Sequence, residues 1–159
     1  MESRNEHEVS SDYFTINIKL FTESQNHNTY YNRKLAIDLN GNIKNAPEQI
    51  TDFGNITDIS LKEAIKQEKF QRLWYIHKAM IDICKDCEFR HMCVDSCDLE
   101  ERKDKSWYRI KECSYNPYIC KWVDEEGYRT LSECGVEVGE QKFSMNKKKL
   151  DSINKELWG

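Results

Sequence analysis

Six of the seven cysteines in this 159-residue chain fall between residues 84 and 120, in the order Cys-x2-Cys-x5-Cys-x3-Cys-x15-Cys-x6-Cys. They are Cys84, Cys87, Cys93, Cys97, Cys113 and Cys120. Cysteine thiolates bind zinc and iron-sulfur clusters. A loop as short as Cys84-Lys-Asp-Cys87 brings two sulfurs to the same side, with backbone amides pointing toward them. We therefore predict that this segment folds around a metal centre.

Two metals compete for this cysteine pattern. Zinc sites commonly pair two short Cys-x2-Cys knuckles, and the x5 and x3 gaps do not repeat one. Unequal short gaps followed by a distant cysteine are more typical of an iron-sulfur cluster, so we expect one 4Fe-4S cluster, with zinc as the alternative. Disulfides rank third because an odd number of cysteines leaves one thiol over. His77 and His91 are expected to be exposed or hydrogen-bonded imidazoles rather than zinc ligands.

Composition narrows the class of protein. The chain has 24 Lys and Arg against 28 Asp and Glu, and its longest basic run is three lysines at residues 147–149. We expect no nucleic-acid partner, because phosphate backbones are bound by larger basic clusters. No apolar run is long enough for a signal peptide or a membrane span, so we expect a cytoplasmic protein without a membrane contact. No motif of a hydrolase, kinase or dehydrogenase is present, which predicts no complete active site in this chain alone.

The elements that must position the cysteines begin after a flexible leader, residues 1–12. Apolar and polar residues alternate over residues 13–21, which predicts a half-buried strand. A second alternating segment, residues 34–45, contains Asn40-Gly41 and predicts a β-hairpin with a type I′ turn. The strand and the hairpin belong to one predicted main domain, residues 13–135.

A helix is predicted over residues 61–72, because Ser60 and Glu63 have the spacing of a capping box. The segment 84–120 lacks a long periodic pattern and is predicted to be irregular and organised by metal. Residues 136–159 form a tail in which apolar residues at helical spacing predict a short helix. The expected fold is a small α+β domain: a hairpin and a helix, then a cysteine-rich lobe and a C-terminal helix.

The cysteines and their neighbours carry a resemblance to a known family. The text Cys84-Lys-Asp-Cys87-Glu-Phe-Arg-His-Met-Cys93-Val-Asp resembles SPASM domains, the auxiliary iron-sulfur modules of radical SAM peptide-modifying enzymes. The stretches Ser114-Tyr-Asn-Pro-Tyr-Ile-Cys120-Lys-Trp and Tyr31-Asn-Arg-Lys are similar to the SPASM-domain peptide maturases of grasp-with-spasm systems. The resemblance covers residues 13–135.

The resemblance implies a ligand set. In the family pattern the first three cysteines of the run and a late one hold a cluster, which maps onto Cys84, Cys87 and Cys93. Cys113 is the expected fourth ligand, and Cys120 is the alternative.

A second cluster is not expected. The family's cysteine before the hairpin glycine is missing here, and Ala46 stands at the position of the one after it. Cys97 would normally serve that absent cluster, so it becomes a spare thiol or a substitute ligand. The isolated Cys134 is expected to be a buried small hydrophobe.

The resemblance also implies a role. The chain lacks the Cys-x3-Cys-x2-Cys loop and the barrel of a radical SAM enzyme, so we expect no radical chemistry from it alone. We expect an accessory domain in the maturation of ribosomally synthesised peptides (RiPPs), transferring electrons, binding the precursor peptide, or both. Its partner would be an ATP-grasp ligase or a radical SAM subunit. The alternative is a zinc-stabilised, non-redox adaptor that binds the peptide for a modifying enzyme.

Three further groups are open to two readings. The acidic residues Asp95, Asp98, Glu100 and Glu101 are expected to form a solvated face, or a site for a basic peptide. Arg90 can bond the cluster or a peptide carboxylate, or form a surface ion pair. The tryptophans Trp74, Trp107 and Trp122 are expected in the core rather than on a peptide-stacking surface.

Overall fold

The computed structural model describes residues 14, 17–96 and 98–159. The predicted leader, residues 1–12, and Cys97 lie outside the described residues. The helices are α1 (Ile18–Ser24), α2 (Leu61–Lys66), α3 (Glu68–Gln71) and α4 (Lys147–Trp158), with 3-10 helices η2 (Arg72–Tyr75), η3 (Lys78–Met80), η4 (Cys84–Asp86) and η5 (Glu88–His91). The strands are β1 (Ala36–Ile37), β2 (Ile43–Lys44), β3 (Leu99–Glu101), β4 (Trp107–Arg109), β5 (Tyr115–Asn116), β6 (Lys121–Trp122), β7 (Val136–Val138) and β8 (Phe143–Met145).

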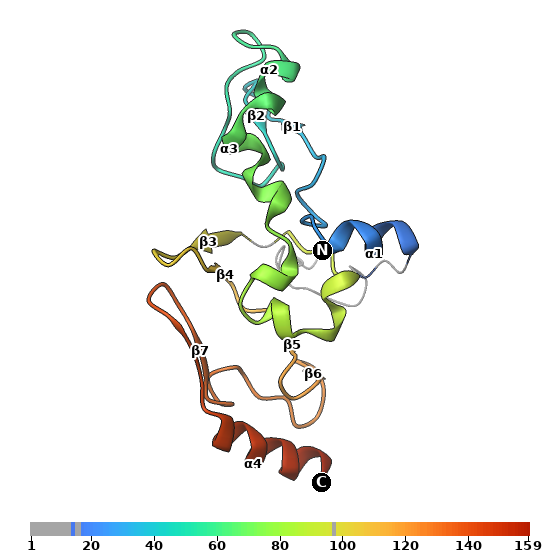
Figure 1. Ribbon diagram of the computed structural model, residues 1–159, viewed down its shortest axis with the longest axis vertical. Helices are drawn as coiled ribbons and strands as arrows, with labels where there is room; N and C mark the ends of the chain where they lie inside the picture. Colours follow the sequence, from blue (N-terminus) through green and yellow to red (C-terminus); the bar gives the residue numbers. More distant parts are fainter. Residues whose placement is uncertain (1–13, 15–16, 97) are drawn as a thin grey trace, which may run out of the picture.

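The elements are spread along the long axis of the molecule (Figure 1). The β1–β2 hairpin lies at one end with α2 and α3, the 3-10 helices and the β3–β4 pair occupy the middle, and α4 closes the other end. Among the described residues every sheet is an antiparallel pair of strands. The fold is α+β, as predicted.

The strand predicted at residues 13–21 is wrong for residues 18–21, which the structure shows as helix. The backbone forms helix α1, whose first turn is capped by the Asn17 side chain accepting from the Leu20 amide at 2.8 Å. Among the described residues of this stretch, Phe14 alone forms a strand-like bridge, with Cys93. Ile18, one of the alternating apolar residues, is 80% exposed. A local cap has therefore overridden the alternating pattern.

The predicted hairpin is present, but its turn is of another kind. Ile37 pairs with Ile43 across β1 and β2. A type I′ turn needs two positive φ values, and here Gly41 has φ +83° while Asn40 does not. The cause is Asp38, whose carboxylate accepts the backbone amides of Asn40 and Asn42 and so holds a longer loop.

The predicted helix over residues 61–72 starts as expected but is interrupted. Ser60 and Glu63 form the capping box. The chain leaves helical geometry at Gln67, where ψ is 128°, and resumes as α3. The Gln67 side chain donates to the Phe53 carbonyl at 2.8 Å, and the break turns Phe70 into the core.

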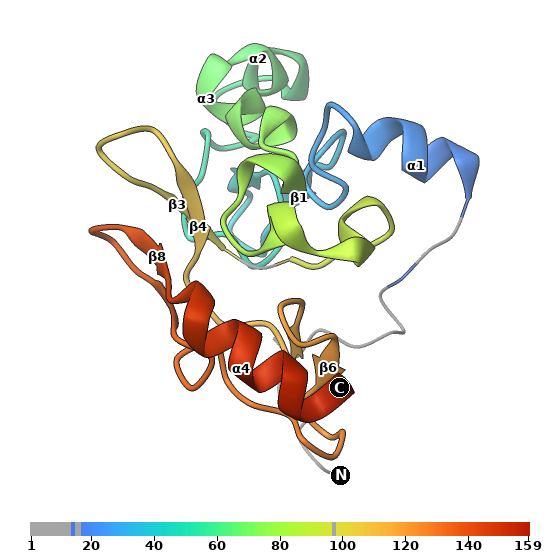
Figure 2. The same ribbon diagram turned by 60° about the horizontal axis from the view of Figure 1, so that its bottom comes forward.

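The second half of the chain packs around a separate apolar cluster. Leu150 and Ile153 of α4 pack with Ile119, Val136 and the completely buried Cys134. Cys134 is thus the buried hydrophobe that was predicted. Figure 2 shows α4 running along the face formed by the chain between β5 and β8. The segment 84–120, predicted to be irregular, contains the pairs β3–β4 and the start of β5–β6.

No described helix has the length and apolar character needed to cross a membrane.

Candidate metal centre

Four cysteines from three segments line one cavity of about 200 Å³. They are Cys84, Cys87, Cys93 and Cys113. These are the four residues that the resemblance implied as cluster ligands. Their assignment as ligands stays a prediction. The structure adds that all four line the same cavity.

The first two cysteines are placed by η4. The Cys87 amide donates to the Cys84 carbonyl at 3.1 Å, which closes the turn between them. The preceding residue, Ile83, has φ +69°, an unusual conformation for a β-branched residue. Ile83 is buried in the apolar cluster under α4, so packing holds the conformation that leads the chain into the cavity.

Cys93 and Cys113 enter the cavity from two later segments. The Cys93 amide donates to the Phe89 carbonyl at 3.0 Å at the end of η5, and the Cys93 carbonyl accepts from the Thr29 hydroxyl at 2.6 Å. Cys113 lies two residues before β5. The turn at residues 110–112 that leads to it also lines the cavity.

The six described cysteines are all free thiols, so the disulfide alternative is wrong for them. Burial raises the pKa of both Cys87 and Cys93 to about 12, and raises that of Cys113 as well. A buried thiolate is costly without a positive partner. Metal ions supply that partner and displace the thiol protons.

The size of the cavity bears on which group would fit. Across the described residues, no three His, Cys, Asp or Glu side chains come close enough together to hold a single metal ion. Tetrahedral zinc requires every ligating sulfur about 2.3 Å from one ion. A space of about 200 Å³ walled by four thiols instead suits a group of several atoms, such as an iron-sulfur cluster.

Buried charges form part of the cavity wall. Lys78 and Arg109 both line it, and their side chains are each 7% exposed. Both cations contact the Oδ2 atom of Asp95, Lys78 through an ion pair and Arg109 at 3.1 Å. The same Oδ2 atom lies 3.5 Å from the Cys93 sulfur. Burial alone would lower the pKa of Lys78, but Asp95 and the cavity thiolates outweigh it and raise that pKa.

A second ionic group stands beside the first. Asp82, which also lines the cavity, pairs with Arg102 at 2.6 Å and with Lys85 at 2.6 Å. Arg102 in turn donates to the Gly139 carbonyl at 2.7 Å, which ties β3–β4 to the loop between β7 and β8. This network links Asp82 in the cavity wall to the β3–β4 and β7–β8 hairpins.

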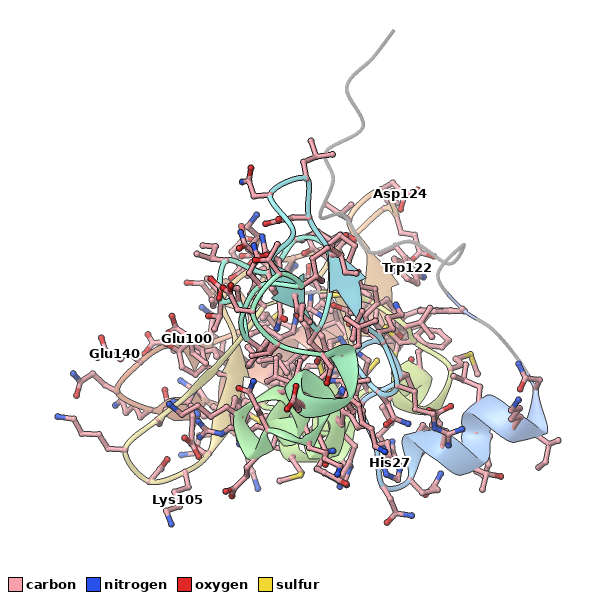
Figure 3. All side chains as sticks on the ribbon, turned by 90° about the horizontal axis from the view of Figure 1, so that it is seen from above. His27, Glu100, Lys105, Trp122, Asp124 and Glu140 are labelled. Carbon is pink, nitrogen blue, oxygen red and sulfur yellow. The ribbon has the colours of Figure 1, made fainter. Side chains whose placement is uncertain are left out.

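Aromatic rings form another part of the cavity wall. The Phe89 ring packs against the tilted Phe14 ring at a centroid distance of 4.7 Å and meets Tyr115 edge to face at 5.0 Å, and Trp122 lies 4.8 Å from Tyr115. All four rings line the cavity. Trp122 is half-buried and lies near the exposed Asp124 (Figure 3). It is therefore part of the wall of the site, whereas Trp107 is a core residue of the kind predicted.

The other candidate metal ligands, Cys120, His77 and His91, lie outside the cavity. Cys120 is exposed, does not line the cavity, and donates weakly to the Pro117 carbonyl at 3.7 Å. His91 is a hydrogen-bonded imidazole, as expected, 2.9 Å from the Ser24 hydroxyl. Neither it nor His77 lines the cavity. Arg90 does line it, and donates to the Cys87 carbonyl at 3.0 Å.

The prediction of an acidic face is wrong for Asp95. Its side chain is 4% exposed and sits between Lys78 and Arg109. Glu100 is exposed on β3, at the outer edge of the molecule near Glu140 (Figure 3). Sequence reasoning also missed Lys78 altogether, because nothing in the pattern distinguishes one lysine six residues before Cys84 from a surface lysine.

Comparison with protein families gives a match to part of the chain. Residues 30–88 match the SPASM family, described as an iron-sulfur cluster-binding domain. No curated protein and no solved structure matches the chain. The matched segment contains Cys84 and Cys87, whereas Cys93 and Cys113 follow it in sequence and join them in the cavity. The resemblance predicted from the cysteines is confirmed over this segment, where residues 30–88 match the model of the SPASM iron-sulfur cluster-binding domain.

Proposed function

We propose that the chain binds one 4Fe-4S cluster through Cys84, Cys87, Cys93 and Cys113. The observation that supports this most is the shared cavity, since these four thiols come from three separate segments and meet at one space. Such a cluster supplies a one-electron redox centre, whose potential depends on burial, charge and hydrogen bonds to its sulfurs. The protein residues hold the centre, exclude water from it with the aromatic wall, and surround it with fixed charges.

The biological role we propose is that of an accessory domain in the maturation of a ribosomally synthesised peptide. The support is the resemblance of the cysteine segments to SPASM modules of peptide-modifying enzymes, together with the family match of residues 30–88. The partners would be a precursor peptide and a modifying enzyme, either an ATP-grasp ligase or a radical SAM subunit. The chain would carry electrons or present the peptide.

The cluster assignment is tested on protein purified and reconstituted without oxygen. We expect a brown protein whose visible absorbance bleaches with dithionite. Cys113→Ala should lose most of this absorbance, whereas the matched variant Cys120→Ala should keep it, because Cys120 lies outside the cavity. A colourless protein with one zinc ion would contradict the proposal, and equal loss in both variants would contradict the choice of the fourth ligand.

The peptide role needs a separate measurement. Synthetic candidate precursor peptides can be titrated into the cluster-loaded protein, and binding can be followed by calorimetry. Saturable binding at micromolar concentration would support the proposal. Absence of binding for every peptide tested would contradict it.

A further inference from the structure

We propose that Lys78 and Asp95 form a buried charge pair that sets the reduction potential of the centre, with Lys78 raising it and Asp95 lowering it. This inference rests on the proposed function, because it requires a bound cluster. It assigns a role to two residues that are not ligands and that lie on different segments of the chain.

The placement of the pair carries the argument. Lys78 starts η3, and its side chain is buried in the wall that also presents the four cysteines. Asp95 follows Cys93 by two residues, and its Oδ2 atom lies 3.5 Å from the Cys93 sulfur. One charge of the pair thus lines the space that the cluster would fill, and the other touches one of its expected ligands.

Other charged side chains also line the cavity, and they are unchanged in both variants. Arg109 contacts the same Asp95 oxygen at 3.1 Å and adds to the positive side. Asp82 lines the cavity as well, but its two oxygens are held by Lys85 and Arg102, each at 2.6 Å. Changing Lys78 or Asp95 therefore changes the fixed charge at the cavity without removing the Asp82 network.

Stability alone does not account for such a pair. Buried ion pairs are expensive to desolvate, and apolar residues of similar size often replace them without loss of stability. A fixed charge in a wall of low dielectric acts strongly on any charge nearby. When one electron passes from a reductant to the cluster, no bond breaks and the centre gains one negative charge. A nearby cation favours that reduced form and a nearby carboxylate opposes it.

The test is a potentiometric titration of the cluster-loaded full-length protein, followed by visible absorbance and electron paramagnetic resonance. At the wild-type midpoint, Lys78→Met should lower the ratio of reduced to oxidised protein about tenfold, which is a shift of about 59 mV for one electron. Asp95→Asn should raise the ratio by a similar factor. Lys78→Arg should restore the wild-type value, and Lys62→Met, which changes an exposed lysine on α2, should leave it unchanged.

The two variants of opposite sign keep the proposal falsifiable. If one variant fails to take up iron, the other still shows whether its midpoint potential shifts in the predicted direction. Midpoints equal to that of wild type, shifts of the same sign in both variants, or failure of both to bind iron would overturn the inference. A wild-type protein that binds no cluster would instead overturn the proposed function on which it rests.

Discussion

The hairpin module, residues 35–75, and the cysteine region, residues 84–122, are held together in different ways. The hairpin module has an apolar core in which Ile43, Ala64 and Phe70 have no exposed surface. The cysteine region instead surrounds a cavity lined by thiols, charges and aromatic rings. The first can fold by burying apolar area, whereas we expect the second to depend on the group that fills its cavity.

Removing the metal should separate the two regions most strongly. After treatment with a chelator, we expect amide protons of β5 and β6 to lose most of their protection from hydrogen exchange, because the buried thiols lose the centre that joins them. Amides of β2 and α2 should stay protected. The variant Cys87→Ala should reproduce this pattern, with Cys120→Ala as its control.

Equal loss of protection in both regions would show that the molecule folds as one unit, and full retention in both would show that the cavity does not need its metal.

A core deletion in the hairpin module should have the reverse effect. Phe70→Ala removes a completely buried ring that packs against Phe53 and Trp74, and we expect it to lower the free energy of unfolding by about 3–5 kcal/mol. The visible absorbance of the cluster should persist at denaturant concentrations that already unfold the variant module. Chemical denaturation followed by circular dichroism measures the free energy of unfolding, and loss of the absorbance at the same denaturant concentration as the module unfolds would contradict the separation.

A smaller effect is expected at the start of α2. Ser60→Ala removes the hydroxyl that caps this helix and should cost about 1 kcal/mol in the same denaturation experiment. Ser132→Ala, at an exposed position in a turn, serves as the matched control. A similar loss in both variants would mean that the capping box does not stabilise the module.

The smallest expected effect is on how the stability of the hairpin depends on pH in acid. The amide of Asn42, together with other donors, lowers the pKa of Asp38 to about 2 in the hairpin loop. A carboxyl group with a lower pKa in the folded state stabilises the fold above its unfolded pKa, and this contribution is lost as the pH falls toward about 2. Asp38→Asn should therefore flatten the loss of hairpin stability between about pH 4 and pH 2, measured by chemical shifts of β1 and β2. An unchanged acid profile would contradict the role of Asp38.

Local patterns predicted the hairpin module well. The structure contains the predicted hairpin and the capping box at Ser60, and it has the predicted α+β class. All three depend on residues that are close together in the sequence. Two predicted details were wrong because of side-chain hydrogen bonds that the pattern did not reveal. The Asp38 carboxylate changed the turn, and the hydrogen bond from Gln67 to Phe53 interrupted the helix.

The cysteine region was predictable only in its chemistry. The spacing indicated that the six clustered cysteines bind a metal centre, and the structure places four of them at one cavity. The charged wall could not be foreseen, because Lys78 and Asp95 are far apart in sequence and each resembles a surface residue. They are buried because they pair with each other in the folded protein, and a periodic sequence pattern does not indicate such a pair.

The most direct test of the central claim is a count of iron and acid-labile sulfide in anaerobically reconstituted protein. The account predicts about four of each per chain. Near-complete loss of both is expected when Cys84, Cys87, Cys93 and Cys113 are changed together to alanine. Iron and sulfide that stay at wild-type levels in that quadruple variant, or a wild-type chain that holds neither, would contradict it.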